Sequence, residues 1–161
     1  MPQDDCVFCK IVAGAIPSRK VYEDERVLVF LDIGPIARGH TLVIPKAHTG
    51  RLEEMDPEDG AAVGRVLPAV GRAVLTATGA ADYNVLQNNG ASAGQAVGHV
   101  HFHVIPRHTP GNVPPPGSDT PNPSGGEGLA FSWPAGELSD RDGAELSETM
   151  RGAMGGVRAE G

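Results

Sequence analysis

Three histidines alternate with apolar residues in the run 99–105, HVHFHVI. On a β-strand, successive side chains point to opposite faces. The pattern therefore predicts that His99, His101 and His103 share one face, while the apolar residues face a core. Neighbouring imidazoles of such a row are ~6.6 Å apart, so one phosphate group cannot bind all three equally. We expect the three rings to have different roles.

The segment before this strand, residues 88–98, reads NNGASAGQAVG and is rich in glycine and small residues. Such a loop brings backbone N–H groups close to an anion, and it favours phosphate chemistry at the histidines. The competing hypothesis is a catalytic zinc ion held by His99, His101 and His103, because His-x-His on a strand is a common zinc ligand pair. An enzyme of that kind would lose its activity to a chelator and regain it with metal.

Two cysteines, Cys6 and Cys9, form a C-x-x-C motif near the N-terminus. They are compatible with incidental reduced thiols, a redox pair or half of a metal site. No strand is expected before the pair, whereas a thioredoxin-like motif follows one, so the redox hypothesis is disfavoured. A metal site needs two further ligands.

The rest of the pattern predicts the elements that position these residues. Strands are expected at 20–23, 27–32, 41–44, 82–88 and 99–106, helical turns at 6–14, and helices at 56–78 and after Ser139. Asp56 and Pro57 are typical of a helix start, and Pro68 is expected to kink the long helix or interrupt its hydrogen bonds. Short antiparallel strands around one long helix indicate an α+β domain.

Composition limits the domain organisation. In the segment 108–128, 11 of 21 residues are glycine or proline, which predicts a loop or disordered insert with His108 in solvent. We therefore expect a core at 1–107, this insert, and a C-terminal segment at 129–161 with one helix.

Charge and hydropathy limit the function. The chain has 161 residues and a net charge of −7, which disfavours binding to a nucleic acid polymer by bulk electrostatics. Apolar runs are too short for a membrane helix, and the acidic start does not resemble a secretory signal. We expect a cytoplasmic protein that acts on a small molecule.

The run 94–107, GQAVGHVHFHVIPR, resembles the signature of the histidine triad (HIT) family. Residues 6–11 resemble the opening of its Hint branch, residues 30–33 its nucleoside-contacting strand and residues 39–46 the next strand. In order and spacing, the resemblance covers residues 6–107.

The resemblance implies a fold and an assembly. The expected fold is a five-stranded antiparallel sheet with one long helix and a short N-terminal helix, and here a C-terminal helix follows the insert. Hint proteins form homodimers, which in this chain would pair through the helix 56–78 and an adjacent strand. In relatives the C-terminal segment reaches the partner's active site. The stretch Leu129–Gly136, with Trp133, is the candidate for that role here, unless Trp133 anchors the tail on its own core.

The resemblance also implies roles for the histidines. His101 would be the nucleophile, with one ring nitrogen held by the backbone carbonyl of His99 and the other attacking an α-phosphorus. His103 and the loop amides would stabilise the phosphoryl oxygens. The other residues assigned to the site are His40 beside the phosphate, Asp32 at the ribose hydroxyls, Ile33 against the base, Asn88 near the phosphate, and Gly94, Gln95, Ala96 and Val97 in the loop.

The implied activity is hydrolysis of an AMP- or GMP-like nucleotide through a nucleotidyl-histidine. Nucleoside 5′-phosphoramidates, acyl-nucleotides and dinucleoside polyphosphates are the expected substrate classes. Pro106-Arg107 also follows the triad in Fhit-like dinucleoside polyphosphate hydrolases, so that alternative stays open. Ala96 stands where many Hint proteins have a serine that hydrogen-bonds the leaving group. A nucleotide-binding scaffold with vestigial hydrolysis is therefore a further alternative.

Several microbial members of the family bind zinc through a C-x-x-C motif and two histidines. The matching residues here are Cys6, Cys9, His48 and His99. Two cysteines and two histidines make a closed, structural zinc site, without the open position of a catalytic one. His99 would then bind metal while His101 performs the chemistry.

Overall fold

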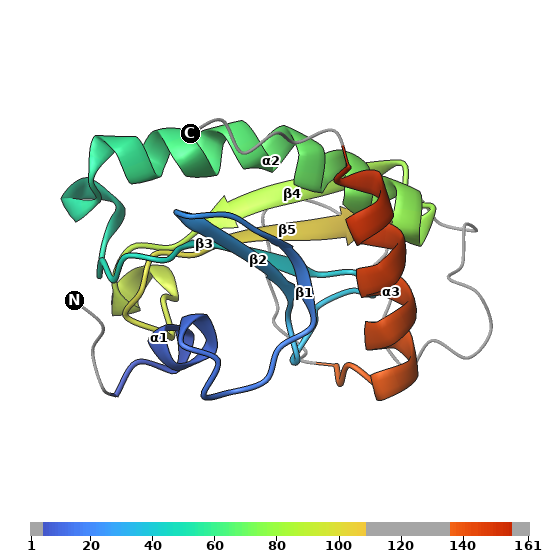
Figure 1. Cartoon of the computed structure of the whole chain (residues 1–161), viewed down its shortest axis with the longest axis horizontal. Helices are drawn as coiled ribbons and strands as arrows, with labels where there is room; N and C mark the ends of the chain where they lie inside the picture. The colour runs from blue at the N-terminus through green and yellow to red at the C-terminus, as the bar shows by residue number, and fades with distance from the viewer. Residues whose placement is uncertain (1–4, 109–135, 156–161) are drawn as a thin grey trace.

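The computed structural model describes residues 5–108 and 136–155. One antiparallel sheet has the strand order β1-β2-β3-β5-β4, with the helices arranged around it (Figure 1). The strands are β1 (Lys20–Glu23), β2 (Val27–Leu31), β3 (Thr41–Pro45), β4 (Asp82–Gln87) and β5 (Phe102–Arg107). The helices are α1 (Val7–Val12), α2 (Pro57–Thr78) and α3 (Asp140–Ala153), with short 3₁₀ turns η1 (Leu52–Glu54) and η2 (Ala91–Ala93). The expected α+β fold is confirmed.

Two features predicted from the sequence cannot be compared with the structure. The glycine- and proline-rich insert, apart from His108, and Trp133 lie outside the described residues. Within the described ranges, no helix has the length and apolar character needed to cross a membrane.

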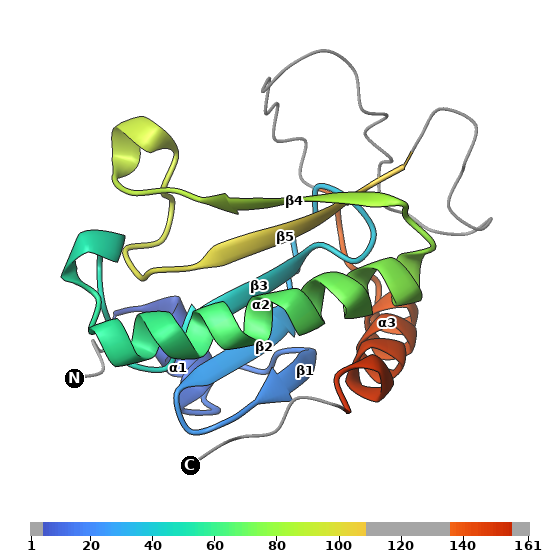
Figure 2. The same cartoon turned by 90° about the horizontal axis from the view of Figure 1, so that it is seen from above.

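The two faces of the sheet are covered by different helices (Figure 2). Alternating residues of β2 explain this: Val27 and Val29 belong to the core that includes α2, whereas Leu28 and Phe30 belong to the core that includes α1. Because both faces of β2 are covered, all five of its residues are buried. α3 adds Leu146 and other apolar residues to the α2 side.

The long helix α2 starts and ends as the sequence predicts. Asp56 caps it by accepting a hydrogen bond from the Glu58 amide, and Gly79 ends it with φ = 69°, a left-handed conformation that favours glycine. Pro68 lies inside the helix, which continues from Pro57 to Thr78. Because proline has no N–H, it interrupts one helical hydrogen bond, as predicted, without ending the helix. Pro68 and Gly64, whose carbonyl loses its helical partner, are both exposed, so water can hydrate that carbonyl.

The strand that carries the triad is shorter than predicted. β5 begins at Phe102, and its pairing with β3 starts where Phe102 lies opposite Val43. Upstream, the Val100 amide donates to the Thr49 carbonyl. His99 and His101 therefore both precede the strand, and only His103 of the three lies in it. The apolar side is as predicted, since Phe102 and Val104 pack into the α2 core.

Candidate active site

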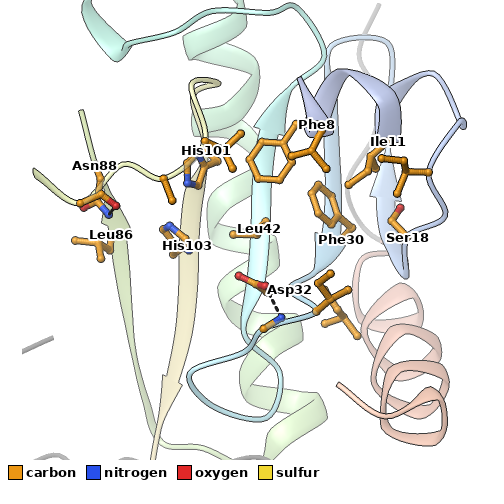
Figure 3. A pocket seen from close by; sticks show the side chains of 18 of the residues that line it. Phe8, Ile11, Ser18, Phe30, Asp32, Leu42, Leu86, Asn88, His101 and His103 are labelled. Carbon is orange, nitrogen blue, oxygen red and sulfur yellow. Dashed lines mark hydrogen bonds between the residues drawn. The ribbon is translucent and has the colours of Figure 1, made fainter. Parts of the chain in front are cut away.

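A cavity of about 770 Å³ opens on the α1 side of the sheet. Its walls come from α1, β2, the loop after β2, β3, β4, the glycine-rich loop and β5. The lining residues are Val7, Phe8, Ile11, Ile16, Pro17, Ser18, Phe30, Leu31, Asp32, Ile33, Gly34, Leu42, Leu86, Asn88, Ala93, Gly94, Ala96, Val97, His101 and His103. Figure 3 shows His101, His103 and Asn88 on one side of the cavity, with Leu86 beside them, and the aromatic rings of Phe8 and Phe30 with Ile11 and Ser18 on the other. A cavity of this shape and size suits a small molecule with a polar and an apolar part.

The apolar end is built mainly by α1 and β2. The rings of Phe8 and Phe30 meet edge to face with centroids 5.8 Å apart, and Ile11 lies beside them (Figure 3). Ile33, on the loop after β2, is 77% exposed and so can contact a ligand. Ile33 was predicted as a site residue from the resemblance, whereas Phe8 and Ile11 were not, although Phe8 lies within the C-x-x-C motif and Ile11 just after it.

His101 lies at the polar end of the cavity, and its two ring nitrogens differ in which one carries the hydrogen. Nδ1 lies 2.6 Å from the backbone oxygen of His99. A carbonyl only accepts, so Nδ1 carries the hydrogen and Nε2 keeps its lone pair. Burial lowers the pKa of His101, against the raising effects of that hydrogen bond and of Asp32. A neutral imidazole with a bare nitrogen is the form that attacks an electrophile.

His103 has the opposite tautomer, because a backbone amide fixes it through His40. The Ile36 N–H donates to Nδ1 of His40 over 3.1 Å, so His40 carries its hydrogen on Nε2. That nitrogen lies 2.9 Å from Nδ1 of His103, which therefore accepts, and His103 carries its hydrogen on Nε2. Burial is the main cause that lowers the pKa of both rings to about 3, so both are neutral near pH 7.

The rings of His101 and His103 are closer than a flat strand would place them, with centroids 4.8 Å apart. A bare nitrogen and an N–H donor therefore stand side by side in the cavity. The first can attack a phosphorus atom while the second donates to one of its oxygens.

The glycine-rich loop is held together by its own hydrogen bonds. The amides of Gly94 and Gln95 donate to carbonyls within the loop, those of Ala91 and Gly90. The Gln95 side chain accepts from the Gly90 amide and donates to the Gly50 carbonyl, so Gln95 supports the loop and is absent from the cavity wall. Gly94, with Ala96, Val97 and Asn88, lines the cavity.

Two groups of side chains have the composition of a metal site among residues 5–108 and 136–155. One is Asp32, His40 and His103, whose ligand atoms lie within 4.8 Å of one another. The hydrogen-bond chain argues against a metal there, because Nε2 of His40 is protonated when Nδ1 accepts from Ile36. The three triad histidines do not themselves form such a group, which removes the basis for the zinc-hydrolase hypothesis.

The other group is Cys6, Cys9, His48 and His99, as the resemblance implied. Sγ of Cys6 and Nδ1 of His99 are 3.5 Å apart, and Sγ of Cys9 lies 3.3 Å from Nδ1 of His48 and 3.7 Å from that of His99. Tetrahedral zinc with ordinary Zn–S and Zn–N bonds separates such ligands by about 3.6 Å. The donor set fits structural zinc.

The surroundings of this cluster also fit a metal. Nε2 of His99 lies 2.9 Å from the Pro45 carbonyl, so it carries the hydrogen and Nδ1 presents a lone pair to the thiols. A carbonyl behind a metal-binding histidine is the usual means of fixing its tautomer. The Cys9 amide lies 3.5 Å from Sγ of Cys6 and donates to it, which helps to orient that sulfur.

His108 corrects a prediction. It is 4% exposed, not solvated, and burial together with the nearby Arg38 guanidinium lowers its pKa. Arg38, only 5% exposed, faces carboxylates of α3. No sequence pattern predicts this buried cluster, since its members are far apart along the chain.

Comparisons with known proteins agree with this geometry. Residues 13–110 match the model of the HIT domain family. The chain is 42% identical over 145 residues to adenosine 5′-monophosphoramidase hnt1 of Schizosaccharomyces pombe, covering 90% of this chain and 95% of that one. It is 49% identical over 105 residues to adenylylsulfatase HINT3 of Arabidopsis thaliana, covering 65% of this chain and 53%, about half, of the plant protein.

A solved structure shares the whole fold. A Zn-bound histidine triad family protein from Mycobacterium smegmatis superposes with a TM-score of 0.70 at 37% identity, covering 94% of each chain. The triad, the cavity, the tautomers and these similarities agree. This chain therefore belongs to the HIT family, as a Hint-like nucleotide hydrolase.

Proposed function

We propose that the chain hydrolyses purine nucleoside 5′-phosphoramidates and related acyl- or sulfo-nucleotides by way of a nucleotidyl-His101 intermediate. The observation that carries the proposal is the pair of opposite tautomers, with bare Nε2 on His101 beside protonated Nε2 on His103. The relatives support the substrate class, because they include adenosine 5′-monophosphoramidases and an adenylylsulfatase.

Substrate binding uses both ends of the cavity. The base packs between Phe8, Phe30 and Ile33, and Asp32 accepts hydrogen bonds from the ribose hydroxyls. One carboxylate oxygen of Asp32 already accepts from the Gly34 amide over 2.8 Å, which orients the other toward the cavity. The α-phosphate then lies at His101.

In the first step, Nε2 of His101 forms a bond to phosphorus and the bond to the leaving group breaks. The leaving amine keeps the electron pair and takes a proton from water, because Ala96 has no hydroxyl to supply one. The positive charge that develops on His101 is stabilised by the His99 carbonyl at Nδ1. His103 donates to a phosphoryl oxygen throughout.

In the second step, water attacks phosphorus and the bond between phosphorus and Nε2 breaks. The electron pair returns to the ring, so His101 regains its starting form, and the water proton passes to solvent. The products are a nucleoside monophosphate and the free amine, acyl acid or sulfate.

His101→Asn tests the proposal. The asparagine amide can still donate to the His99 carbonyl, but it offers no nucleophilic nitrogen, so we expect turnover to fall by at least about 10³-fold. Calorimetric AMP binding should persist, since the apolar end is unchanged. Turnover within tenfold of the unsubstituted protein would overturn the mechanism.

Two alternatives have a structural observation behind them. Arg107 lies two residues after Ile105 on the same face of β5 and donates to Asn84, which makes it the candidate contact for a second phosphate group of a dinucleoside polyphosphate. Ala96 in the cavity wall favours a scaffold with vestigial turnover. A panel of AMP amidates, AMP esters and dinucleoside polyphosphates, measured beside AMP binding, distinguishes the three.

We also propose that Cys6, Cys9, His48 and His99 hold structural zinc. The bound metal would fix the start of α1 against the segment before β5. Zinc thiolates need reduced cysteines, which supports a cytoplasmic location.

A homodimer is the proposed assembly. β4 is an edge strand whose outward side has no partner among the described residues, and Tyr83 and Val85 on it are 39% and 49% exposed. α2 packs beside this strand, since a Cβ on the buried Gly71 would meet the Tyr83 ring. Two copies related by a two-fold axis could continue the sheet through β4.

A further inference from the structure

The loop between β2 and β3, residues 32–40, holds two kinds of site residue. Asp32 and Ile33 face the nucleoside end of the cavity, and His40 with the Ile36 amide fixes the tautomer of His103. The loop is closed by the Asp32 amide, which donates to the His40 carbonyl over 3.0 Å. Any shift of this loop would therefore move both Asp32, which is proposed to bind the ribose, and His40, which donates a hydrogen bond to His103.

The C-terminal segment holds this loop from outside. The Gly136 amide donates to the Pro35 carbonyl over 2.9 Å, and the Leu138 amide donates to the Ile33 carbonyl over 3.2 Å. Figure 2 shows the orange segment before α3 passing beside this loop. The two donor residues, Gly136 and Leu138, lie beyond residue 110, where the match to the family model ends.

Arg38 adds a side-chain connection between the loop and α3. Its Nε is 3.6 Å from a carboxylate oxygen of Asp142, and its Nη2 is 3.3 Å from one of Glu145. The side chains of Arg38 and Asp142 are 5% and 6% exposed, whereas that of Glu145 is 64% exposed. Charges shielded from water interact strongly, and exposed ones weakly.

We propose that Arg38 and Asp142 are positioning residues, through which α3 holds the Ile36 amide and His40 in the alignment that keeps His103 an Nε2–H donor. This inference rests on the proposed function, since it assigns His103 a role in turnover. Arg38 is two residues from both Ile36 and His40, and the turn between them is closed by the His40 amide, which donates to the Ala37 carbonyl over 2.9 Å. An anchored guanidinium therefore fixes the turn that carries both groups.

The first test compares Asp142→Asn with Glu145→Gln in the full chain. Both remove one carboxylate charge facing Arg38, but only Asp142 is buried. We expect Asp142→Asn to lower kcat by about tenfold or more, because small misplacements of catalytic groups are costly, and Glu145→Gln to change it by less than about twofold. Equal effects of the two, or no effect of Asp142→Asn, would overturn the proposal.

A second variant separates positioning from stability. Asp142→Asn removes the buried carboxylate that faces Arg38 and leaves only the exposed Glu145 to pair with the cation. Arg38→Met combined with Asp142→Asn removes both buried charges and keeps an apolar side chain of similar length. We expect the double variant to recover Tm while kcat stays low, because the loop is still unanchored. Recovery of kcat together with Tm would show a purely structural role and refute the positioning one.

The third readout does not need an active enzyme. Long-range ¹H–¹⁵N spectra report which ring nitrogen of His103 carries the hydrogen. We expect Nε2–H alone in the unsubstituted protein and in Glu145→Gln, and a mixture of tautomers in Asp142→Asn and in the double variant. Identical His103 spectra in all four proteins would refute the proposal even if the proposed substrates were wrong. A mixture in Asp142→Asn and the double variant, and in neither of the other two proteins, would support it whatever the substrate.

Discussion

At the scale of single residues, the chemistry depends on where two hydrogens lie. Two backbone groups decide this: the His99 carbonyl places one on Nδ1 of His101, and the Ile36 amide, through His40, places one on Nε2 of His103. Because burial lowers the pKa of these rings, protonation does not erase the difference near neutral pH. The active form is therefore built into the backbone.

His40→Gln and His40→Leu test this chain of hydrogen bonds. The glutamine amide can donate to Nδ1 of His103 in place of Nε2 of His40, whereas leucine fills the space without a donor. We expect His40→Gln to keep more activity, with kcat higher than that of His40→Leu by about tenfold or more. Steady-state kinetics below the Tm of both variants measures the difference, and equal kcat values would contradict it.

Ala96→Ser tests the leaving-group step. A hydroxyl at this point of the cavity wall can donate to the departing amine, so turnover of substrates with poor leaving groups should rise by several-fold to about tenfold. Ala93→Ser is the matched control, because it adds the same group to another lining residue outside the position expected to contact the leaving group. A similar gain in both variants would rule out a specific effect at Ala96.

At the scale of elements, two cysteines help to position α1: Cys6 caps the helix and Cys9 lies within it. Phe8 lies between them in sequence and its ring contacts the rings of both His99 and His101, with centroids 5.8 and 5.2 Å apart. A metal at the cysteines therefore fixes one wall of the cavity and the strand-like segment that carries the nucleophile.

Cys9→Ser should remove most of the zinc and lower the stability of α1. Protein purified without chelator should contain about one zinc per chain, and the variant much less, with a fall in Tm of several degrees or more. Val7→Ser, on the exposed side of the same helix, should keep its zinc. Elemental analysis and thermal unfolding give both numbers, and equal zinc in all three proteins would dismiss the site.

Most elements could be predicted from sequence, because caps and alternation are local signals. Asp56, Gly79 and Ser139 mark helix ends where the structure has them. The strand of the triad begins three residues later than predicted, because the Val100 amide donates to the Thr49 carbonyl. No local sequence pattern reveals that contact. Pro68 fits within α2 because it faces solvent, a tertiary fact.

The residues of the candidate site also fall into those that could be predicted from the sequence and those that could not. His101, His103 and the cysteine–histidine cluster were predictable because their types and spacing are informative. The burial of His108 and Arg38 was not, because it depends on tertiary packing, such as that of α3 against the loop before β3. The apolar wall at Phe8 and Ile11 was missed because apolar residues carry no chemical signal of their own.

At the scale of the whole molecule, buried neutral histidines make stability depend on pH. The unfolded chain binds protons at His40 and His103 below about pH 6.5, whereas in the folded protein burial lowers both pKa values to about 3. The unfolded state therefore binds more protons, and stability falls as the pH drops from 6.5 toward 3.

The expected loss is up to roughly 2 kcal/mol per histidine at pH 5. Urea unfolding at pH 7 and pH 5 measures it, and the zinc-free Cys9→Ser background separates it from metal release. His103→Gln in that background should show a smaller difference between the two pH values. No difference between pH 7 and pH 5 in the background protein would contradict the burial of neutral rings.

Assembly is also a property of the whole molecule. Val85→Glu places a charge on the exposed edge strand β4, and Leu52→Glu does the same at an apolar residue of similar exposure on η1. We expect the first to shift the protein toward monomer by at least tenfold in Kd and the second to leave the dimer intact. Analytical ultracentrifugation distinguishes them, and a monomeric unsubstituted protein would refute the proposed dimer.

The position of Phe8 between Cys6 and Cys9 has a consequence for growth conditions. The Phe8 side chain lines the cavity and contacts the His101 ring, and the ion proposed beside it would hold both cysteines that flank it. In a cell starved of zinc, loss of the ion would thus weaken substrate binding and slow the reaction at the same time. A shortage of this nutrient would lower nucleotide turnover.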